Sequence, residues 1–305
     1  MNLLAGVAQI AGVVLAPLLP GSIQALKARL QGRRGPSALQ PYRTLRRLWS
    51  KSAVDPEGTG VIYRLAPPLV AACMLAALAI VPVGAHGGSF GLGNDALVFV
   101  SLLALARFAL AAAAWDTGSA FALMAAARDL MISVFGEALL VLVLLLAAAP
   151  AHSSDLKAMS AAAAGGQIWS APTHWCGALA FVLLILVETG RQPIDNPDTH
   201  LELTMIHEGP LLEYGGRDLA LVQWAAAARH WVMLVLGGEL FLPHWGGFAA
   251  SLGLLVVSVA FLCGLLAAIE TTQAKMRILR VPALLGVGCA IALAGAGMWV
   301  GGIGA

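Results

Sequence analysis

The chain has 305 residues, of which 59% are hydrophobic and only 11% are charged, and its mean hydropathy is +0.84. An average soluble domain carries roughly a quarter charged residues, so this chain has too few charges to form the solvated surface of a globular protein. The composition predicts a polytopic membrane protein, and it excludes a nucleic-acid-binding protein and a cytosolic enzyme.

Eight apolar segments approach or exceed the length that a helix needs to cross a bilayer, about 20 residues. The predicted fold is therefore all-α, a single membrane domain with about eight transmembrane helices. They are expected at residues 3–25, 63–83, 96–115, 130–149, 174–189, 218–241, 248–270 and 281–301. The first has no basic region before it and no A-x-A cleavage motif, so it is expected to be a retained span and not a signal peptide.

Lysine and arginine predict the orientation of these spans. If the N-terminus lies outside, the inner loops are 26–62, 116–129, 190–217 and 271–280. Together with Arg64 these loops hold 15 of the 18 basic residues. Of the other three, Lys157 lies in an outer loop, and Arg107 and Arg229 fall within spans. This is the asymmetry of the positive-inside rule, so both termini are expected on the outer side of a bacterial cytoplasmic membrane.

The first inner loop combines a basic turn with a short amphipathic segment. Arg33-Arg34-Gly35-Pro36 is a turn signal, and Gln40-Pro41-Tyr42 opens the next element. Leu45, Leu48 and Trp49 then recur at helical spacing, opposite Arg43, Arg46, Arg47 and Lys51. This pattern predicts a short helix in the plane of the membrane interface. The charge by itself is also explained by anionic lipid headgroups.

The third inner loop is unusually acidic. Seven of the chain's 16 carboxylates lie between residues 188 and 218, and three prolines divide this stretch into short pieces. Carboxylates clustered beside a bilayer raise one another's pKa, which suits a proton relay near neutral pH. His200 and His207 are seven residues apart, whereas the zinc motif H-E-x-x-H needs a separation of four. Hydrogen-bonding or relay roles are therefore favoured for both over metal binding.

Several charges fall inside the predicted spans, where they would be costly against lipid. Glu137, Arg107, Arg229 and Glu270 are expected to face the bundle interior, either as structural pairs or as part of a watery path. Glu239 lies near the outer end of its span and is expected to reach water by snorkelling. His230 is expected either to join the buried network or to be an ordinary core histidine. The histidines near the outer loops need no special role (His86, His152, His174, His244).

Four stretches resemble one family closely. They are LKARLQGRRGPSALQPY (26–42), WDTGSAF…ARD…GE (115–137), ETGRQPIDNPDTHLELTMIHEGPLLEYGGRDLAL (188–221) and IETTQAKMRILRVP (269–282). The chain resembles the membrane subunit 1 (H-type) of respiratory complex I, and more closely its relatives in hydrogenase-4 and formate hydrogenlyase complexes. Both branches share the Arg-Arg-Gly-Pro turn and a pattern that falls here on Trp115, Arg128 and Glu137.

The resemblance implies a cofactor-free membrane subunit that docks a peripheral arm and relays protons. The partners would be hydrogenase-like large and small subunits, carrying a [NiFe] centre and iron–sulfur clusters, and antiporter-like membrane subunits. The relay residues carried over by motif are Glu137, Glu188, Asp195, Glu202 and Glu213, with Glu208, Asp116 and Arg128. Partner docking falls on Arg33, Arg34, Gly35, Pro36, Gln40, Tyr42, Arg191 and Arg277. The four cysteines form no CxxC pair, so the chain offers no recognisable iron–sulfur, zinc or haem-attachment motif of its own.

Two alternative functions stay open, of which one differs in the electron acceptor and the other in the class of protein. The quinone-reducing branch has a shorter spacing in the third loop; here Glu202 and Glu213 are eleven residues apart, which favours the hydrogenase branch. A quinone-site subunit of an NADH- or ferredoxin-quinone oxidoreductase stays the first alternative. A free-standing ion transporter is the second, and no internal repeat supports it.

Overall fold

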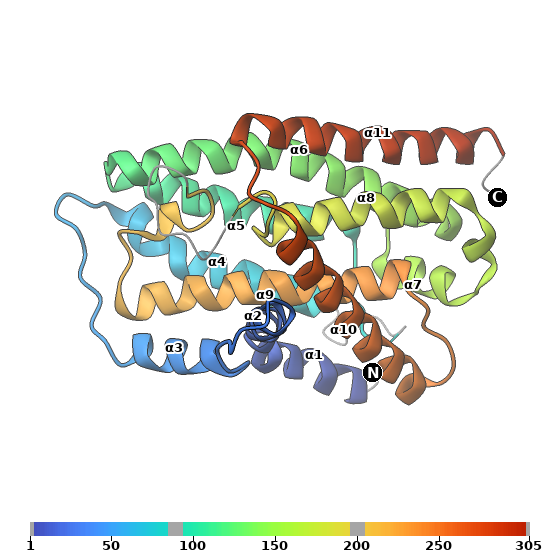
Figure 1. Cartoon of the computed structure of the whole chain (residues 1–305), viewed down its shortest axis with the longest axis horizontal. Coiled ribbons are helices and arrows are strands. Elements are labelled where there is room, and N and C mark those ends of the chain that lie inside the picture. The colour runs from blue at the N-terminus through green and yellow to red at the C-terminus, as the bar shows by residue number, and fades with distance from the viewer. Residues whose placement is uncertain (1–2, 85–93, 196–204, 303–305) are drawn as a thin grey trace.

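The computed structural model describes residues 3–84, 94–195 and 205–302, and in these ranges every regular element is a helix (Figure 1). The α-helices are α1 (Leu3–Leu15), α2 (Leu18–Leu30), α3 (Gln40–Trp49), α4 (Val61–Ile80), α5 (Ala96–Asp116), α6 (Ala120–Ala151), α7 (Leu156–Ala164), α8 (Pro172–Glu188), α9 (Gly216–Phe241), α10 (Phe248–Thr272) and α11 (Val281–Val300). Three short 3-10 helices are η1 (Gln167–Ser170), η2 (Gly209–Leu211) and η3 (Ile278–Arg280).

Six helices in the described ranges are long and apolar enough to cross a membrane: α4, α5, α6, α9, α10 and the continuous η3–α11. The predicted first span is a bent pair, because α1 and α2 meet at an angle of 54°. Pro17 lies at the bend and has no N–H to continue the helical ladder. Counted as one span, this pair makes a seventh. The other predicted span is α8, an apolar helix of 17 residues.

The helix that contains the predicted fourth span, α6, begins ten residues before that span. The connection expected at 116–129 is reduced to Thr117–Ser119, because α6 already begins at Ala120. Residues 120–129 are rich in alanine and contain no glycine or proline, so they form a helix readily. The early start places Arg128 and Asp129 on the same helix as Glu137.

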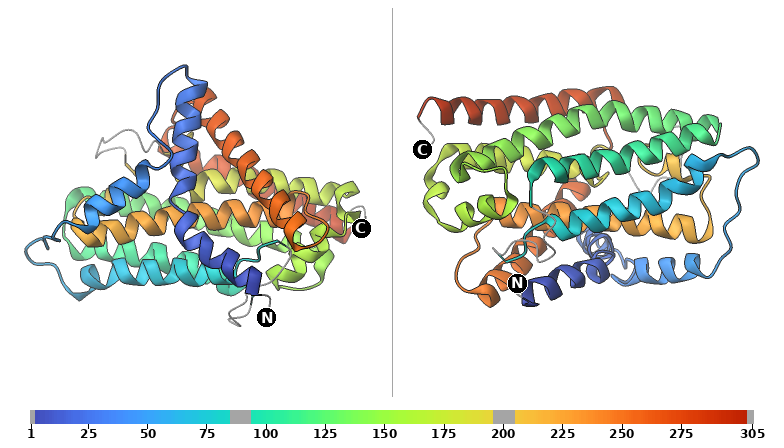
Figure 2. Two further views of the ribbon diagram at one scale, coloured as in Figure 1. Left: turned by 90° about the horizontal axis from the view of Figure 1, so that it is seen from below. Right: turned by 180° about the vertical axis from the view of Figure 1, so that it is seen from behind.

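The long helices form a bundle with two distinct ends. In Figure 1, α4, α5, α6, α8, α9 and α11 run side by side. The α3 end of the bundle holds α3 and the α5–α6 turn, and the α7 end holds α7 and the α9–α10 connection. Helices α2 and α10 contact each other and lean away from the bundle, as the left view of Figure 2 shows. The segments after α8 and after α10 contact each other, since the backbone N–H of Met276 donates to the Pro193 carbonyl at 2.8 Å.

The amphipathic segment between the first two predicted spans forms the helix α3. Its arginines are exposed or half-buried, and Trp49 is 54% exposed. The Tyr42 hydroxyl donates a hydrogen bond of 2.6 Å to the Val14 carbonyl. This bond fastens α3 to the bend between α1 and α2, where the last carbonyls of α1 lack helical partners.

Candidate functional site

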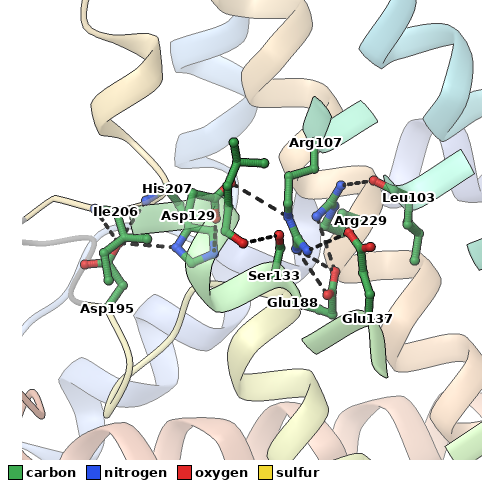
Figure 3. A network of polar contacts seen from close by, with 11 residues as sticks. Leu103, Arg107, Asp129, Ser133, Glu137, Glu188, Asp195, Ile206, His207 and Arg229 are labelled. Carbon is green, nitrogen blue, oxygen red and sulfur yellow. Dashed lines mark hydrogen bonds and ion pairs between the residues drawn. The ribbon is translucent and has the colours of Figure 1, made fainter. Parts of the chain in front are cut away.

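Eight charged side chains form a chain of contacts through the bundle, which we call the central network: Arg107, Asp129, Glu137, Glu188, Asp195, His207, Arg229 and Lys275. Figure 3 labels all of them except Lys275. They come from α5, α6, α8 and α9 and from the segments that follow α8 and α10. Residues separated by as many as 81 positions are in direct contact here.

The inner part of the network is centred on Arg107. Its Nη2 donates to both carboxylate oxygens of Glu188 at 3.1 Å. Arg229 Nη1 donates to the same carboxylate at 3.2 Å, and its Nη2 donates to the Leu103 carbonyl at 3.1 Å. The side chains of Glu188 and Arg107 are 1% and 5% exposed. Such a buried group of charges is stable only when every member is paired and hydrogen-bonded.

One face of α6 supplies the remaining acids around Arg107. Asp129, Ser133 and Glu137 follow one another at intervals of four, so they lie on one face of the helix. Arg107 lies 3.7 Å from the Asp129 carboxylate and 3.6 Å from that of Glu137. The Glu137 side chain is 34% exposed. The network therefore reaches the lateral surface of the chain at Glu137.

The outer part of the network is centred on Asp195. Its carboxylate accepts bonds from Lys275 Nζ at 2.9 Å and from the backbone N–H groups of Ile206 and His207 at 3.2 and 3.1 Å. Gly190 precedes it with φ of +60°, and a Cβ there would lie 2.9 Å from His207 Nδ1. Only glycine gives this turn and this close approach at no cost.

Asp195 and His207 stabilise each other's charged form. Burial by itself would raise the pKa of Asp195, but hydrogen bonds from His207 and Lys275 outweigh it and hold that pKa well below its usual range. Burial would likewise lower the pKa of His207, but the hydrogen bond and charge of Asp195 and the charge of Asp129 raise it. His207 is therefore favoured as a cation between two acids.

The two parts of the network meet at Asp129 through long contacts. His207 Nδ1 lies 3.3 Å from Asp195, whereas His207 Nε2 lies 3.6 Å from Asp129 Oδ1 and makes no hydrogen bond within the described ranges. On its other side, Asp129 is 3.7 Å from Arg107. Both distances exceed a hydrogen bond but lie within reach of a small movement or one bridging water. Asp129 is thus the loosest link between two tightly bonded parts.

A second buried cluster ties the inclined helices to the same segment. Arg191 Nη1 lies 3.0 Å from Glu270 on α10, and Lys27 on α2 lies 3.3 Å from the same carboxylate. Arg191 Nε donates to His230 Nε2 on α9 at 3.1 Å. Glu270 is 2% exposed. This cluster fixes the segment after α8 relative to α2, α9 and α10.

A cavity of about 550 Å³ lies between α2, α3, α9 and segments 189–195 and 205–214. Arg191, Asp195, His207, Glu208 and His230 line it, together with apolar residues. The cavity therefore borders both the central network and the cluster around Glu270. In the described ranges no three His, Cys, Asp or Glu side chains are grouped so that they could hold a metal ion.

Three of the predicted relay carboxylates meet in the central network (Glu137, Glu188, Asp195). Glu208 lines the cavity, and Glu202 lies outside the described residues. The structure gives the other three predicted relay residues different contacts. Asp116 caps α4 by accepting two backbone N–H bonds of 2.9 Å, and the Glu213 carbonyl accepts a bond of 2.7 Å from the Tyr63 hydroxyl. Arg128 donates at 3.5 Å to the Met205 carbonyl.

The predicted docking residues divide into a surface group and an interior group. The turn between α2 and α3 and the segment after α10 expose five of them (Arg33, Arg34, Gly35, Pro36, Arg277). Gln40 is exposed and lines the cavity, and Tyr42 is partly buried against Val14. Arg191 is only 3% exposed and is bonded to Glu270, so its side chain lies in the interior and not on the surface.

Sequence reasoning missed Asp129 and Lys275. The eight-residue spacing from Asp129 to Glu137, two intervals of four through Ser133, was a usable signal, whereas nothing in the sequence indicates that Lys275 contacts Asp195. The pairing of Arg107 with carboxylates is confirmed. The expectation that Glu239 snorkels to water is wrong, because this residue is 0% exposed and is covered by α7 and the α9–α10 connection.

The chain is similar to known proteins along most of its length. A family model described as NADH dehydrogenase matches residues 3–300. Hydrogenase-4 component C of Escherichia coli is 33% identical over 299 residues, covering 95% of this chain and 93% of that protein. Formate hydrogenlyase subunit 4 of the same organism is 31% identical over 281 residues and covers 87% of each chain.

More distant similarities extend to quinone- and sulfur-linked complexes. An H-type subunit of the NADH-quinone oxidoreductase of Cereibacter sphaeroides is 29% identical over 225 residues, covering 72% of this chain and 70% of that one. A chain in the structure of the membrane-bound sulfane sulfur reductase, an archaeal respiratory membrane complex, has the same fold. It superposes with a TM-score of 0.83 at 20% identity, covering 97% of this chain and 98% of that chain.

Proposed function

Because the chain belongs to the NADH dehydrogenase (complex I subunit 1-like) family, we propose that it anchors a [NiFe]-hydrogenase-type arm to the membrane and couples the arm's redox chemistry to proton movement. The similarity to hydrogenase-4 component C and formate hydrogenlyase subunit 4 supports the hydrogenase branch. In this proposal the chain itself carries no redox centre, and the [NiFe] centre and iron–sulfur clusters belong to the partner subunits.

The observation that carries the proposal is the unbroken sequence of contacts from Lys275 to Glu137. It begins at the segments after α8 and α10 and ends at a carboxylate on the side of the bundle. His207 stands in the middle with one ring nitrogen toward Asp195 and the other toward Asp129. An imidazole in this position can take a proton at one nitrogen and release one at the other.

A docked partner would control proton transfer at the long contacts of Asp129. A redox event in the docked arm changes the field on segment 189–195 or its position. In a weakly screened interior, a movement of less than about 1 Å would change the charge balance among His207, Asp129 and Arg107 substantially. Closing the gap of 3.6 Å between His207 and Asp129 favours transfer of a proton from the imidazolium to the Asp129 carboxylate. Water beside Arg107 would have to carry the proton on to Glu137, since the guanidinium itself does not give up a proton. Glu137 would then exchange protons with an antiporter-like neighbour that covers it.

Docking is proposed at the exposed basic turn around Arg33 and Arg34 and at Arg277. The Arg33–Pro36 turn joins α2 and α3, and both of these helices line the cavity. In the segment after α10, Lys275 contacts Asp195, which also lines the cavity. A partner bound there would lie beside Asp195, where the network begins. With the positive-inside orientation, this face is the cytoplasmic one, and both termini lie on the outer side of a bacterial cytoplasmic membrane.

The cavity supports a second candidate, a quinone-site subunit. Its volume of about 550 Å³ is large enough for a ring-sized ligand, and it is bordered by Arg191 and His207. The similarity to the H-type subunit of an NADH-quinone oxidoreductase favours the same assignment. Purification of the intact complex separates the two: a co-purified large subunit with both terminal CxxC pairs supports hydrogen chemistry, and a large subunit without them supports a quinone acceptor.

The test of the relay is Asp129→Asn in the intact complex, reconstituted in sealed vesicles. The expected result is an arm that stays bound and evolves hydrogen from an artificial donor, with proton-coupled turnover reduced at least about tenfold, typical for a lost proton-transfer group. Asp155→Asn is the matched control, since Asp155 caps α7 at the other end of the bundle. Unchanged coupling in Asp129→Asn would refute the relay, and loss of the arm would assign Asp129 to docking.

A further inference from the structure

A separate group of polar side chains is buried at the α7 end of the bundle. We call Glu239, Ser160 and His244 the α7-end site; they are 0%, 0% and 1% exposed. Ser160 Oγ donates to Glu239 Oε2 at 2.6 Å, and the backbone N–H of Gly84 donates to Glu239 Oε1 at 2.6 Å. The site thus joins α7, the end of α9, the α9–α10 connection and the residue Gly84 that follows α4. It shares no residue with the central network.

The hydrogen bonds of His244 determine its protonation. Its Nε2 lies 2.9 Å from the Ser160 carbonyl and its Nδ1 lies 3.0 Å from the Leu242 carbonyl. A carbonyl oxygen only accepts hydrogen bonds, whereas a neutral imidazole has one donor nitrogen and one acceptor nitrogen. In either neutral tautomer, one ring nitrogen would therefore turn a lone pair toward a carbonyl. Both contacts are satisfied only when the ring carries both protons, that is, as an imidazolium.

His230 shows the opposite arrangement in the same helix bundle. Its Nδ1 faces the Ala226 carbonyl at 3.0 Å, but its Nε2 accepts a hydrogen bond from Arg191 Nε at 3.1 Å. One donor and one acceptor match a neutral ring. The two buried histidines therefore differ in protonation because of the groups around them and not because of burial, which they share.

We propose that the α7-end site is a proton-holding site, in which His244 keeps a proton as an imidazolium paired with the Glu239 carboxylate. His244 Nε2 lies 3.7 Å from Glu239 Oε2, and Ser160 Oγ bridges them at 3.1 and 2.6 Å. With the proton in place, the ion pair and its hydrogen bonds hold α7 and Gly84 against α9. Loss of the proton removes the cation from beside a buried carboxylate and turns a lone pair of the ring toward a carbonyl oxygen, so the packing of α7 against α9 is destabilised.

The other titratable groups at this end of the bundle have contacts of their own. Asp95 and Asp155 each accept a bond from a backbone N–H at the start of their helices, α5 and α7, and Lys157 is exposed. On α8, His174 packs against Trp169 and Phe241. Apart from Glu239, the charged groups of α4, α8, α9 and α10 lie at the middle of the helix (Arg229) or toward its other end (Arg64, Glu188, Arg217, Asp218, Glu270). His152 follows α6 and is exposed, and His86 lies outside the described residues.

The test is a double-mutant cycle on the full-length chain in detergent, with thermal unfolding measured from pH 6 to pH 9. Glu239→Gln and His244→Gln each remove one member of the buried ion pair and keep the other, so each is expected to lower Tm by several degrees. The double variant is expected to lose clearly less than the sum of the two. His152→Gln, the same change at an exposed histidine of this end, is expected to leave Tm unchanged.

The pH dependence separates a held proton from an ordinary hydrogen bond. An imidazolium in the folded chain contributes to stability only while the ring holds its second proton, whereas the hydrogen bond of a neutral ring does not depend on pH. The Tm difference between the wild type and His244→Gln should therefore shrink toward pH 9. A difference that is constant with pH, or additive losses in the cycle, would overturn the proposal.

If His244→Gln does not fold, nitrogen-15 NMR of the histidine-labelled wild type and Glu239→Gln at pH 8.5 gives the decision. The expected result is an imidazolium signal in the wild type that is lost or shifted in Glu239→Gln, while the signal of His207 is unchanged. Identical spectra of the two chains would contradict the ion pair.

Discussion

The central network and the α7-end site hold acids and bases in one apolar bundle, but with different bond lengths. At the α7 end, Glu239 accepts two bonds of 2.6 Å, Ser160 Oγ bridges its 3.7 Å contact with His244, and no residue of the site is more than 1% exposed. In the central network, Asp129 is held at 3.6 and 3.7 Å, and Glu137 is 34% exposed. Short, closed bonds fix a protonation state, whereas long contacts beside a cavity allow it to change. The difference indicates one region suited to holding a proton and another suited to passing one.

The largest effect is expected where the central network is tight. Arg107→Met removes the cation that Glu188, Asp129 and Glu137 share and leaves Arg229 as the one remaining cation beside Glu188 in the central network. Removal of one partner from a buried ion pair costs about 3–5 kcal/mol of the free energy of unfolding. Thermal unfolding of the detergent-solubilised chain measures this. Arg107→Lys is the control: it keeps the charge but not the two bonds to Glu188, so its loss should be smaller. Equal losses would mean that geometry, and not charge, holds the inner part together.

A smaller effect is expected from a matched pair of serine substitutions. Ser160→Ala removes the donor to the Glu239 carboxylate and should cost about 2 kcal/mol, as expected for a buried bond to a charged group. Ser133 is also buried, beside the central network, but its hydroxyl donates to the Leu130 carbonyl within its own helix, so Ser133→Ala should cost less than about 0.5 kcal/mol. Similar losses at both positions would remove the contrast between the two regions.

The helices of this chain could be predicted from the sequence because apolar length alone marks a span, and the charges on α6 could be grouped by their spacing. The bend at Pro17 was also readable from the lack of an N–H at that residue. The site was only partly predictable. Glu239 stands near the end of an apolar stretch, where a free side chain would snorkel, but α7 and the α9–α10 connection cover it. Asp195 accepts a hydrogen bond from Lys275, which lies 80 residues further along the chain. Contacts of that kind depend on how the inclined helices pack, which local patterns do not encode.

The smallest effect is expected at the loose side of the network and depends on pH. Because the pKa of His207 is raised in the folded chain, its stabilising contribution is full below about pH 6.5, the value of a free imidazole, and is lost as the pH rises through the folded-state pKa. The pKa of Asp195 is lowered, so its contribution is present above about pH 4 and is lost on acidification. The Tm difference between the wild type and His207→Gln should therefore be greatest near pH 5–6 and decrease toward pH 9, by no more than a few degrees, since the 24% exposed side chain is partly screened by water. A difference that grows with pH would mean that His207 is neutral between its two acids, and the proton it is proposed to pass would have to enter the network elsewhere.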